Sequence, residues 1–405
     1  MEALKVLVSG ASIAGPTVAF WLERYGADVV VVEKAPELRL GGQLVDLRGV
    51  ARVALQKMGI DSAVRAATEP NASMSFVDSR NRIRGTLNVR DYGGDGPIAE
   101  IEILRGELSR TVVESAGSGV DYRFGDRINS LAQSDDGVDV TFASGGTERF
   151  DLVLGGDGVH SELRDMVMPA QDVELKHLGV YVSFWTAENH LGLRDSTVLY
   201  SEAGRSIGMR AIVDNSRVMA FLSFQGGPPS YDWRDVAAQK RIALARASGM
   251  GWEAAQLLSQ IDTAGDFYFD TCTQVKLRSW SQGRVALLGD AAHSASPLSG
   301  HGTTMAFVAG YVLAGELAAA GGDHRTAFAR YERKFRPFTE TIQKYAPSNA
   351  YIMTPRTQFG VEWRNNVTRL AERLPGKRLL VQNMVKMSNS FELDDYSSHV
   401  ASLHR

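Results

Sequence analysis

The 405-residue sequence has little cysteine, little excess charge and no long hydrophobic run. Its one cysteine, Cys272, excludes an internal disulfide and a metal cage built from several thiolates. With 44 basic and 47 acidic residues the net charge is -3, which gives no long-range attraction to nucleic acid or anionic lipid. The most apolar stretch, residues 305–317, contains Glu316 and is shorter than the roughly 20 residues of a bilayer span. We therefore expect no nucleic-acid partner, no membrane span and, because no charged apolar leader precedes the first predicted strand, a cytoplasmic location.

The rest of the composition is that of a globular protein. Hydrophobic residues make up 44% of the chain, and 40 residues are glycine. A chain of this length exceeds one compact core, so we expect two packed units. Residues 305–317 are then expected to form a buried helix.

The first 33 residues predict a strand, a helix and a second strand. Residues 5–9 are a short apolar run that ends at Gly10, and residues 16–25 have apolar side chains at helical spacing before Gly26. Residues 28–32 are almost entirely apolar, as expected of a parallel strand buried on both faces, and Glu33 follows them. The pattern predicts a βαβ unit.

Later segments predict a separate antiparallel sheet and then a further strand of the parallel sheet. Residues 177–224 alternate in the manner of an antiparallel sheet, whereas residues 284–288 return to the pattern of a buried parallel strand. Further predicted strands cover residues 73–77, 83–89, 137–142 and 150–154, and predicted helices cover 50–58, 107–116, 234–248, 252–260, 303–320, 323–336, 364–374 and 377–387. We expect one discontinuous domain of residues 1–170 and 266–345, an inserted sheet domain of residues 171–265 to which 72–100 contribute, and a helical segment of residues 346–405.

Three glycine-bearing junctions follow predicted strands. The first runs from Gly10 to Gly15, the second covers residues 155–164 and begins Gly-Gly-Asp-Gly, and the third covers residues 289–293 followed by 297–302. Junctions of this kind hold ligands in open α/β sheets. A structural turn without a ligand is the alternative for each of them.

The first junction suits a dinucleotide. Gly10 permits a tight turn, Gly15 lets helix and strand approach, and the helix N-terminus offers free N–H groups to a pyrophosphate. Glu33, at the end of the second strand, can accept hydrogen bonds from ribose hydroxyls. Ser12 stands where a glycine is usual, but a small residue still leaves room for a phosphate.

The third junction places an acid and a loop ahead of a helix. A carboxylate at the end of a buried strand is costly without donors, so ligand hydroxyls are plausible partners of Asp290, and a helix N-cap is the alternative. Gly300 and Gly302 precede the helix predicted from residue 303, whose N-terminus favours an anion. A plain helix-entry loop is the alternative for that segment.

Several other residues are better explained by packing. His293 and His301 have no third ligand at metal-site spacing, Cys272 has the pattern of a strand core position, and the segment around Ser12 lacks the closing glycine of a nucleophile elbow. We expect neither a metal site nor a hydrolase triad.

The three junctions, in this order and over most of the chain, resemble the class A flavoprotein monooxygenases, the para-hydroxybenzoate hydroxylase type of FAD enzyme. The resemblance implies an α/β fold with a Rossmann-type FAD-binding domain, an inserted antiparallel-sheet substrate domain and C-terminal helices. It assigns FAD binding to Gly10, Ser12, Ile13, Ala14, Gly15, Glu33, Lys34, Gly42, Gln43, Arg48, Arg105, Asp157, Gly289, Asp290, Pro297, Gly300 and Gly302.

Individual roles follow from the resemblance. The first junction and Glu33 would bind the ADP half of FAD, Asp157 would lie near the pyrophosphate and the NAD(P)H path, and Asp290 would bind the ribityl chain. Arg105 opens a predicted helix and would also contact FAD. Gly42-Gln43 with Asp46-Leu47-Arg48 looks like a loop beside the flavin in the tetracycline-inactivating branch and its actinobacterial relatives.

The function implied is NAD(P)H- and O2-dependent hydroxylation of an aromatic or polyketide-like molecule through a flavin C4a-hydroperoxide. Because the flavin carries the chemistry, no catalytic side chain is expected. The expected substrate wall comprises Phe184, Met209, Arg210, Phe221, Phe224 and Tyr268, all of which can equally be core residues because strand facing is uncertain by one residue. Antibiotic inactivation of the tetracycline type, Baeyer–Villiger oxidation and a non-catalytic flavin-binding protein remain alternatives. A halogenase is disfavoured because its Trp-x-Trp-x-Ile-Pro element is absent.

Overall fold

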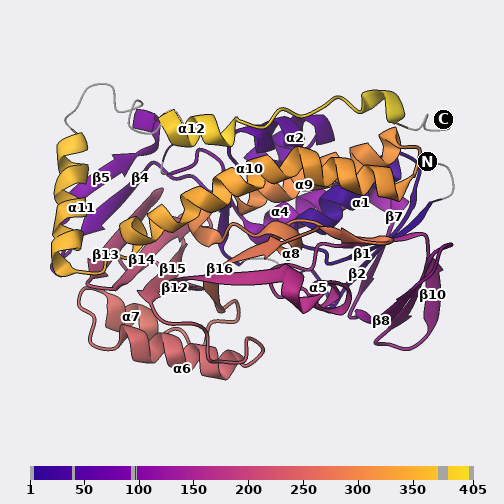
Figure 1. Ribbon diagram of the computed structural model, residues 1–405. Coiled ribbons are helices and arrows are strands. Elements are labelled where there is room, and N and C mark those ends of the chain that lie inside the picture. Colours follow the sequence, from indigo (N-terminus) through magenta and orange to yellow (C-terminus); the bar gives the residue numbers. More distant parts are fainter. Residues whose placement is uncertain (1–3, 39–41, 93–95, 97, 373–381, 401–405) are drawn as a thin grey trace.

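The computed structural model describes residues 4–38, 42–92, 96, 98–372 and 382–400, and it contains two large sheets with helices packed around them (Figure 1). The strands of the first large sheet are β1 Lys5–Ser9, β2 Asp28–Glu33, β7 Val120–Phe124, β11 Leu152–Gly155, β17 Ser281–Gln282 and β18 Val285–Leu287. Their order is β17-β18-β11-β1-β2-β7, and all neighbours are parallel except β17 and β18. The apolar runs in β1 and β2 are buried, as their patterns predicted.

The second large sheet is mainly antiparallel. Its strands are β4 Ser73–Val77, β5 Ile83–Asn88, β12 Val173–Glu188, β13 Ser196–Glu202, β14 Arg205–Ile212, β15 Arg217–Gln225 and β16 Tyr268–Leu277. The order is β16-β12-β15-β14-β13-β4-β5, with only β13 and β4 parallel. The antiparallel sheet predicted from the alternation of residues 177–224 is thereby confirmed.

Two smaller sheets complete the strands. One comprises β8 Ile128–Gln133, β9 Val138–Phe142 and β10 Thr147–Phe150, and the other pairs β3 Leu44–Asp46 with β6 Glu102–Leu104. The single strand predicted over residues 150–154 is wrong. Phe150 pairs with Val138 in the small sheet, whereas Leu152 pairs with Val6 in the large one, so the chain changes sheets at Asp151.

Most helices overlap their predicted positions, but α10 continues to Met353, beyond the predicted residues 323–336, and α11 begins at Gln358 instead of residue 364. Helices α3 and α5 were not predicted. Their bounds are α1 Ala14–Arg24, α2 Val50–Met58, α3 Asp61–Ala66, α4 Arg105–Ser115, α5 Glu162–Val167, α6 Val236–Ala247, α7 Ala254–Leu258, α8 Asp290–His293, α9 Gly302–Ala319, α10 His324–Met353, α11 Gln358–Ala371 and α12 Gln382–Ser388. Short 3-10 turns are η1 Val89–Tyr92, η2 Gly117–Gly119, η3 Ala170–Asp172, η4 Pro297–Ser299 and η6 Ser397–His399. In Figure 1 the long α10 runs past both large sheets.

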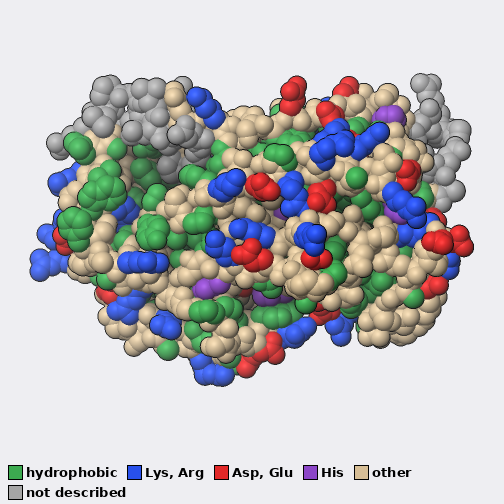
Figure 2. Space-filling view, viewed as in Figure 1, with side chains coloured by type: hydrophobic (Ala, Val, Ile, Leu, Met, Phe, Trp, Pro, Cys, Tyr) green, Lys and Arg blue, Asp and Glu red, His purple; other side chains and the backbone are tan. Residues whose placement is uncertain are grey.

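Helix α9 is the buried helix that the sequence predicted. By length and composition it could cross a membrane, but 89% of it is buried inside the protein. Its close approach to α1 depends on Gly310, because a Cβ there would lie 2.8 Å from Thr17 Cγ2. On the face shown in Figure 2 basic and acidic side chains are interspersed, in keeping with the balanced charge. A cytoplasmic location stays a prediction.

The division into domains also stays a prediction. Strands β4 and β5 lie in the same sheet as β13, which agrees with a contribution of residues 72–100 to that side. Strand β16 joins the same sheet by pairing with β12, although residues 266–345 were expected in the other domain. Residues 93–95, 97, 373–381 and 401–405 of the predicted segments lie outside the described residues.

Candidate functional site

The three glycine junctions meet at one edge of the six-stranded sheet. They follow β1, β11 and β18, which are neighbouring parallel strands, so their carboxyl ends lie side by side. A Cβ on Gly10 would lie 2.7 Å from the carbonyl oxygen of Gly156, and one on Gly289 would lie 2.7 Å from Ala14 Cβ. Glycine at these positions therefore lets the first junction touch the second and the third. The chain turns to opposite sides from β1 and β11, which is the place where open α/β sheets bind ligands.

The first junction presents an uncapped helix start. The N-cap residue of α1, Ile13, has no side-chain capping bond, and the first turn contains no acid. Free N–H groups at such an end attract a phosphate. Glu33 accepts hydrogen bonds from the backbone N–H groups of Ala11 and Ala35, both at 2.9 Å. Each carboxylate oxygen keeps a second lone pair for a ligand hydroxyl.

The second junction is held by its own aspartate. Asp157 accepts from Ser161 Oγ at 2.5 Å and from the N–H of Leu163 at 3.1 Å, and so fixes the start of α5. Burial raises the pKa of the Asp157 carboxyl, against the effect of these two bonds. The buried Arg164 donates to the carbonyl oxygens of Val159 and Ala291, which ties this junction to the third.

The third junction combines an accessible carboxylate with a second uncapped helix. Asp290 is exposed, yet the surrounding protein raises the pKa of its carboxyl by burial. A pocket at this edge of the sheet, here called the crevice, is lined by residues of the first and second junctions together with Glu33 and Lys34. Residues 297–302, here called the flavin-side loop after the role that the resemblance predicts for them, lead into α9, whose first turn has neither a side-chain cap nor an acid.

Arg105 and Gln43 test whether this edge of the sheet fits a dinucleotide. Arg105 Nη1 donates to Ser12 Oγ at 3.2 Å, but its Nε and the Oε1 of Gln43 are buried and have no hydrogen-bond partner among the described residues. Gly42 lies beside them, since a Cβ there would be 3.7 Å from Arg105 Nε. Buried polar atoms are rarely left unpaired, so these atoms fit the phosphates and hydroxyls of a dinucleotide. Arg48, by contrast, bonds to Asp46 and to the carbonyl oxygen of Gly96.

A polar cluster adjoins the crevice, and the sequence analysis assigned no role to three of its members, His160, Trp233 and Asp270. Asp270 on β16 is buried and accepts from Tyr268 OH at 3.2 Å, while His160 Nε2 lies 3.1 Å from its Oδ2. The His160 ring stacks on Trp233 at 4.7 Å between centroids, and Lys34 Nζ lies 4.8 Å from the Trp233 ring. No sequence signal brings residues 34, 160, 233 and 270 together, because the contacts join separate elements.

The six expected wall residues divide between the two faces of the seven-stranded sheet. Met209 and Phe224 are fully buried in the core beneath α6 and α7. Phe184, Arg210, Phe221 and Tyr268 occupy the alternate positions, so they share the opposite face, here called the inner face. The three aromatic side chains there are only partly buried. Leu298 of the flavin-side loop packs into the same cluster as Phe184, so this face borders the loop.

The two histidines and the cysteine that the sequence analysis assigned to packing are in contact with other protein groups or buried. His293 Nε2 lies 3.1 Å from Tyr331 OH, and His301 Nε2 lies 2.8 Å from Ser388 Oγ. Cys272 is fully buried on β16, where burial raises its pKa to about 12. A thiol with this pKa is neutral at physiological pH and unreactive.

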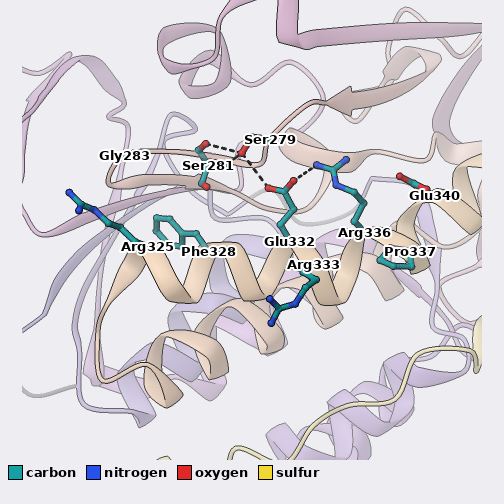
Figure 3. A pocket seen from close by; sticks show the side chains of 11 residues that line it. Ser279, Ser281, Gly283, Arg325, Phe328, Glu332, Arg333, Arg336, Pro337 and Glu340 are labelled. Carbon is teal, nitrogen blue, oxygen red and sulfur yellow. Dashed lines mark hydrogen bonds and ion pairs between the residues drawn. The ribbon is translucent and has the colours of Figure 1, made fainter.

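The crevice is distinct from a larger surface groove. Figure 3 shows that groove, about 830 Å³ in volume, between α10 and the turn that contains β17. An ion pair of Glu332 with Arg336 and a bond from Ser279 to Glu332 hold its wall. None of the residues expected to bind cofactor or substrate line it.

Comparison with known proteins agrees with this geometry. The family described as FAD binding domain matches residues 3–346. Two flavin-dependent monooxygenases from unknown prokaryotic organisms are 37% and 36% identical to this chain, over 84% and 97% of it and over 88% and 99% of their own lengths. The crystal structure of the tetracycline destructase Tet(51) is 34% identical, with a TM-score of 0.85 over 97% of this chain and 100% of that one.

The match covers the three junctions and both large sheets, and the relatives are matched over nearly their whole lengths. The expected fold class is confirmed, and FAD is the cofactor. The chain belongs to the FAD binding domain family and is an FAD-dependent monooxygenase of class A.

Proposed function

We propose that this monooxygenase consumes NAD(P)H and O2 and hydroxylates an aromatic or polyketide-like small molecule through a flavin C4a-hydroperoxide. One observation carries the proposal: the edge where the three junctions meet is continuous, through the flavin-side loop, with the inner face and its partly buried aromatic side chains. A flavin held at that edge borders a pocket with aromatic walls.

The cofactor would be held mainly by backbone. The N–H groups at the start of α1, with Gly10, Ser12, Ile13, Ala14 and Gly15, would receive the pyrophosphate, and Glu33 the adenosine ribose. Lys34, Gly42, Gln43, Arg48, Arg105, Asp157, Gly289, Asp290, Pro297, Gly300 and Gly302 would complete the site. Arg105 supplies the buried unpaired donor and Gln43 the buried unpaired acceptor that such a ligand satisfies.

The division of labour follows from what FAD supplies. When bound, FAD provides the redox and oxygen-transfer chemistry, and the protein binds, orients and excludes water. In the overall reaction the substrate gains one oxygen atom from O2, and the other leaves as water, formed with a hydride (two electrons and one proton) from NAD(P)H and one further proton from solution. Residues 1–170 and 266–345 would form the FAD-binding domain, 171–265 the substrate domain, and 346–405 a helical brace. The nicotinamide would approach beside Asp157.

The substrate would lie against four of the six wall candidates. Phe184, Phe221 and Tyr268 offer aromatic surface, and Arg210 offers a buried cation on the same face. The rings of Phe184 and Tyr268 are 6.2 Å apart between centroids. This combination suits a flat ring system with an acidic oxygen. Met209 and Phe224 are no longer candidates for contact, because they point into the opposite core.

A tetracycline-type antibiotic is the second candidate substrate. It is favoured by the likeness to the tetracycline destructase Tet(51) over 97% of this chain. Tetracyclines are also flat, polyoxygenated ring systems, so the same wall would serve.

A substrate screen tests the proposal and separates the candidates. The FAD-loaded protein is supplied with NADPH or NADH and air in the presence of phenols, polyketide quinones or tetracyclines, and NAD(P)H consumption and product mass are followed. We expect one class to accelerate consumption and to gain a single atom of 18O from 18O2. Consumption that no compound accelerates, with hydrogen peroxide as its only oxygen product, would contradict the proposal.

A further inference from the structure

Two acidic side chains face each other across the small sheet of β3 and β6. Asp46 pairs directly with Glu102 in that sheet. Like charges in this position destabilise a strand pair unless each is compensated. Arg48 Nη2 lies 2.7 Å from Asp46 Oδ2, and Arg210 Nη2 lies 2.6 Å from Glu102 Oε2. The four residues therefore alternate as Arg210, Glu102, Asp46 and Arg48, and we call them the charged row.

The charged row is largely removed from water. The side chains of Arg210 and Arg48 are 5% and 3% exposed, and that of Glu102 is 13% exposed. Burial raises the pKa of Glu102, the neighbouring Asp46 carboxylate acts in the same direction, and Arg210 opposes both. Charges in such surroundings interact strongly, so a change at one member alters the balance at the next.

The two ends of the charged row lie in different parts of the site. Arg210 stands on β14 at the inner face. Its Nη1 and Nη2 donate to the carbonyl oxygens of residues 69, 70 and 211, so the nitrogen open to a substrate oxygen is Nε, which is buried without a partner among the described residues. At the other end, a Cβ on Gly300 would lie 3.5 Å from Asp46 Oδ2 and 3.8 Å from Arg48 Nε. Thr304 Oγ1, in the first turn of α9, lies 3.3 Å from the Arg48 carbonyl oxygen. The row thus joins the expected substrate wall to the flavin-side loop.

We propose that the charged row couples the substrate site to the FAD site. An ionisable phenol or enol oxygen of the substrate binds the Arg210 guanidinium, and the resulting change in charge balance passes through Glu102 and Asp46 to Arg48 and the flavin-side loop. Glu102 and Asp46 are positioning residues in this scheme, since neither touches the reacting atoms. Substrate and FAD then bind cooperatively, and each tightens the other by the same factor. The inference rests on the proposed function and adds to it a substrate class and a coupling device.

The test is a FAD titration of the FAD-stripped full chain by calorimetry. It is run alone, with the hydroxyanthraquinone emodin, and with emodin tri-O-methyl ether, which lacks the acidic oxygens. We expect emodin to lower the Kd for FAD at least fivefold and the ether to change it less than twofold. An equal effect of the two compounds, or no effect of emodin, would overturn the inference.

Variants locate the coupling in the charged row. E102Q and D46N keep a hydrogen-bonding group and remove one charge each, so the effect of emodin on the FAD Kd should fall below twofold. E102D keeps the charge and should retain most of the effect. E100Q is the matched control, because Glu100 is 54% exposed and its nearest cation, on Arg52, is 3.9 Å away. If E102Q or D46N does not fold, as judged by its melting curve, R210K serves instead and should also lose the effect.

The outcomes separate this inference from the function on which it rests. If E102Q and D46N keep the full effect of emodin on the FAD Kd, and the protein binds FAD and oxygenates a substrate, the coupling role of the charged row is refuted and the proposed function stands. A wild-type chain that binds FAD but oxygenates nothing would refute the proposed function.

Discussion

The crevice edge of the six-stranded sheet and the inner face of the seven-stranded sheet are specified in different ways. At the edge, glycines allow backbone segments to touch, as where a Cβ on Gly156 would lie 2.9 Å from the amide nitrogen of Gly15. At the inner face, the site is formed by side chains. Adjacent residues of a strand point to opposite faces of the sheet. A site made by backbone leaves a local mark in the sequence, whereas a site made by side chains depends on strand register.

The largest effect should come from a Cβ at the crevice edge. Gly10→Ala should reduce FAD retention below a tenth of that of the wild type, because the added Cβ collides with the Gly156 carbonyl and φ is +100°. Gly145→Ala is the control, since Gly145 has φ of +95° and open space around it. Both variants carry the positive-φ cost of about 1–2 kcal/mol. The measurement is the ratio of flavin to protein absorbance, and equal ratios in the two variants would contradict the backbone-made site.

Next in size is the loss of the Asp290 carboxylate. Asp290→Ala should weaken FAD binding about 10- to 100-fold, the equivalent of one hydrogen bond to a charged group at about 1.5–3 kcal/mol. Asp290→Asn keeps an acceptor and should lose less. Fluorescence titration of the stripped protein with FAD measures both. An unchanged affinity in the alanine variant would contradict a contact between Asp290 and FAD.

A pair of alanine substitutions tests strand facing. Phe221→Ala should raise KM at least fivefold with little change in stability, because Phe221 is partly exposed on the inner face. Met209→Ala should cost about 2–5 kcal/mol of unfolding free energy and leave KM within twofold, because Met209 is fully buried in the opposite core. Denaturant melts and steady-state kinetics read out both. The reverse pattern would show that the inner face has been assigned to the wrong residues.

The last prediction concerns acid stability. Burial lowers the pKa of His293 to about 3, below its unfolded value of about 6.5, so the unfolded chain binds a proton that the folded chain does not. Stability from this group is full above pH 6.5 and falls by about 1.4 kcal/mol per pH unit between pH 6.5 and 3. Melting curves from pH 7 to 4 should be flatter for His293→Gln. Parallel curves would contradict the buried neutral imidazole.

The sequence predicted the crevice edge better than the inner face. Gly10, Gly156 and Gly289 lie far apart in the chain, but each follows a buried parallel strand, and the ends of such strands share one edge of the sheet. The inner face could not be predicted in the same way. One residue of register separates Arg210, which faces inward, from Met209, which faces the other core.

Contacts between distant elements were not predictable at all. The bond of Arg210 to Glu102 joins β14 to β6, and that of His160 to Asp270 joins the second junction to β16. Neither pair has a spacing or pattern that marks it. Helix α10 shows a further limit, since it continues through Pro337 and Pro347, where proline usually ends a helix.

The most direct test of the crevice is the visible spectrum of the purified chain before and after titration with FAD, followed by anaerobic addition of NADPH or NADH. The account predicts one FAD bound per chain and bleaching of its absorbance by one of the two reductants. A colourless protein that takes up no FAD would contradict it and would leave the three glycine junctions as structural turns.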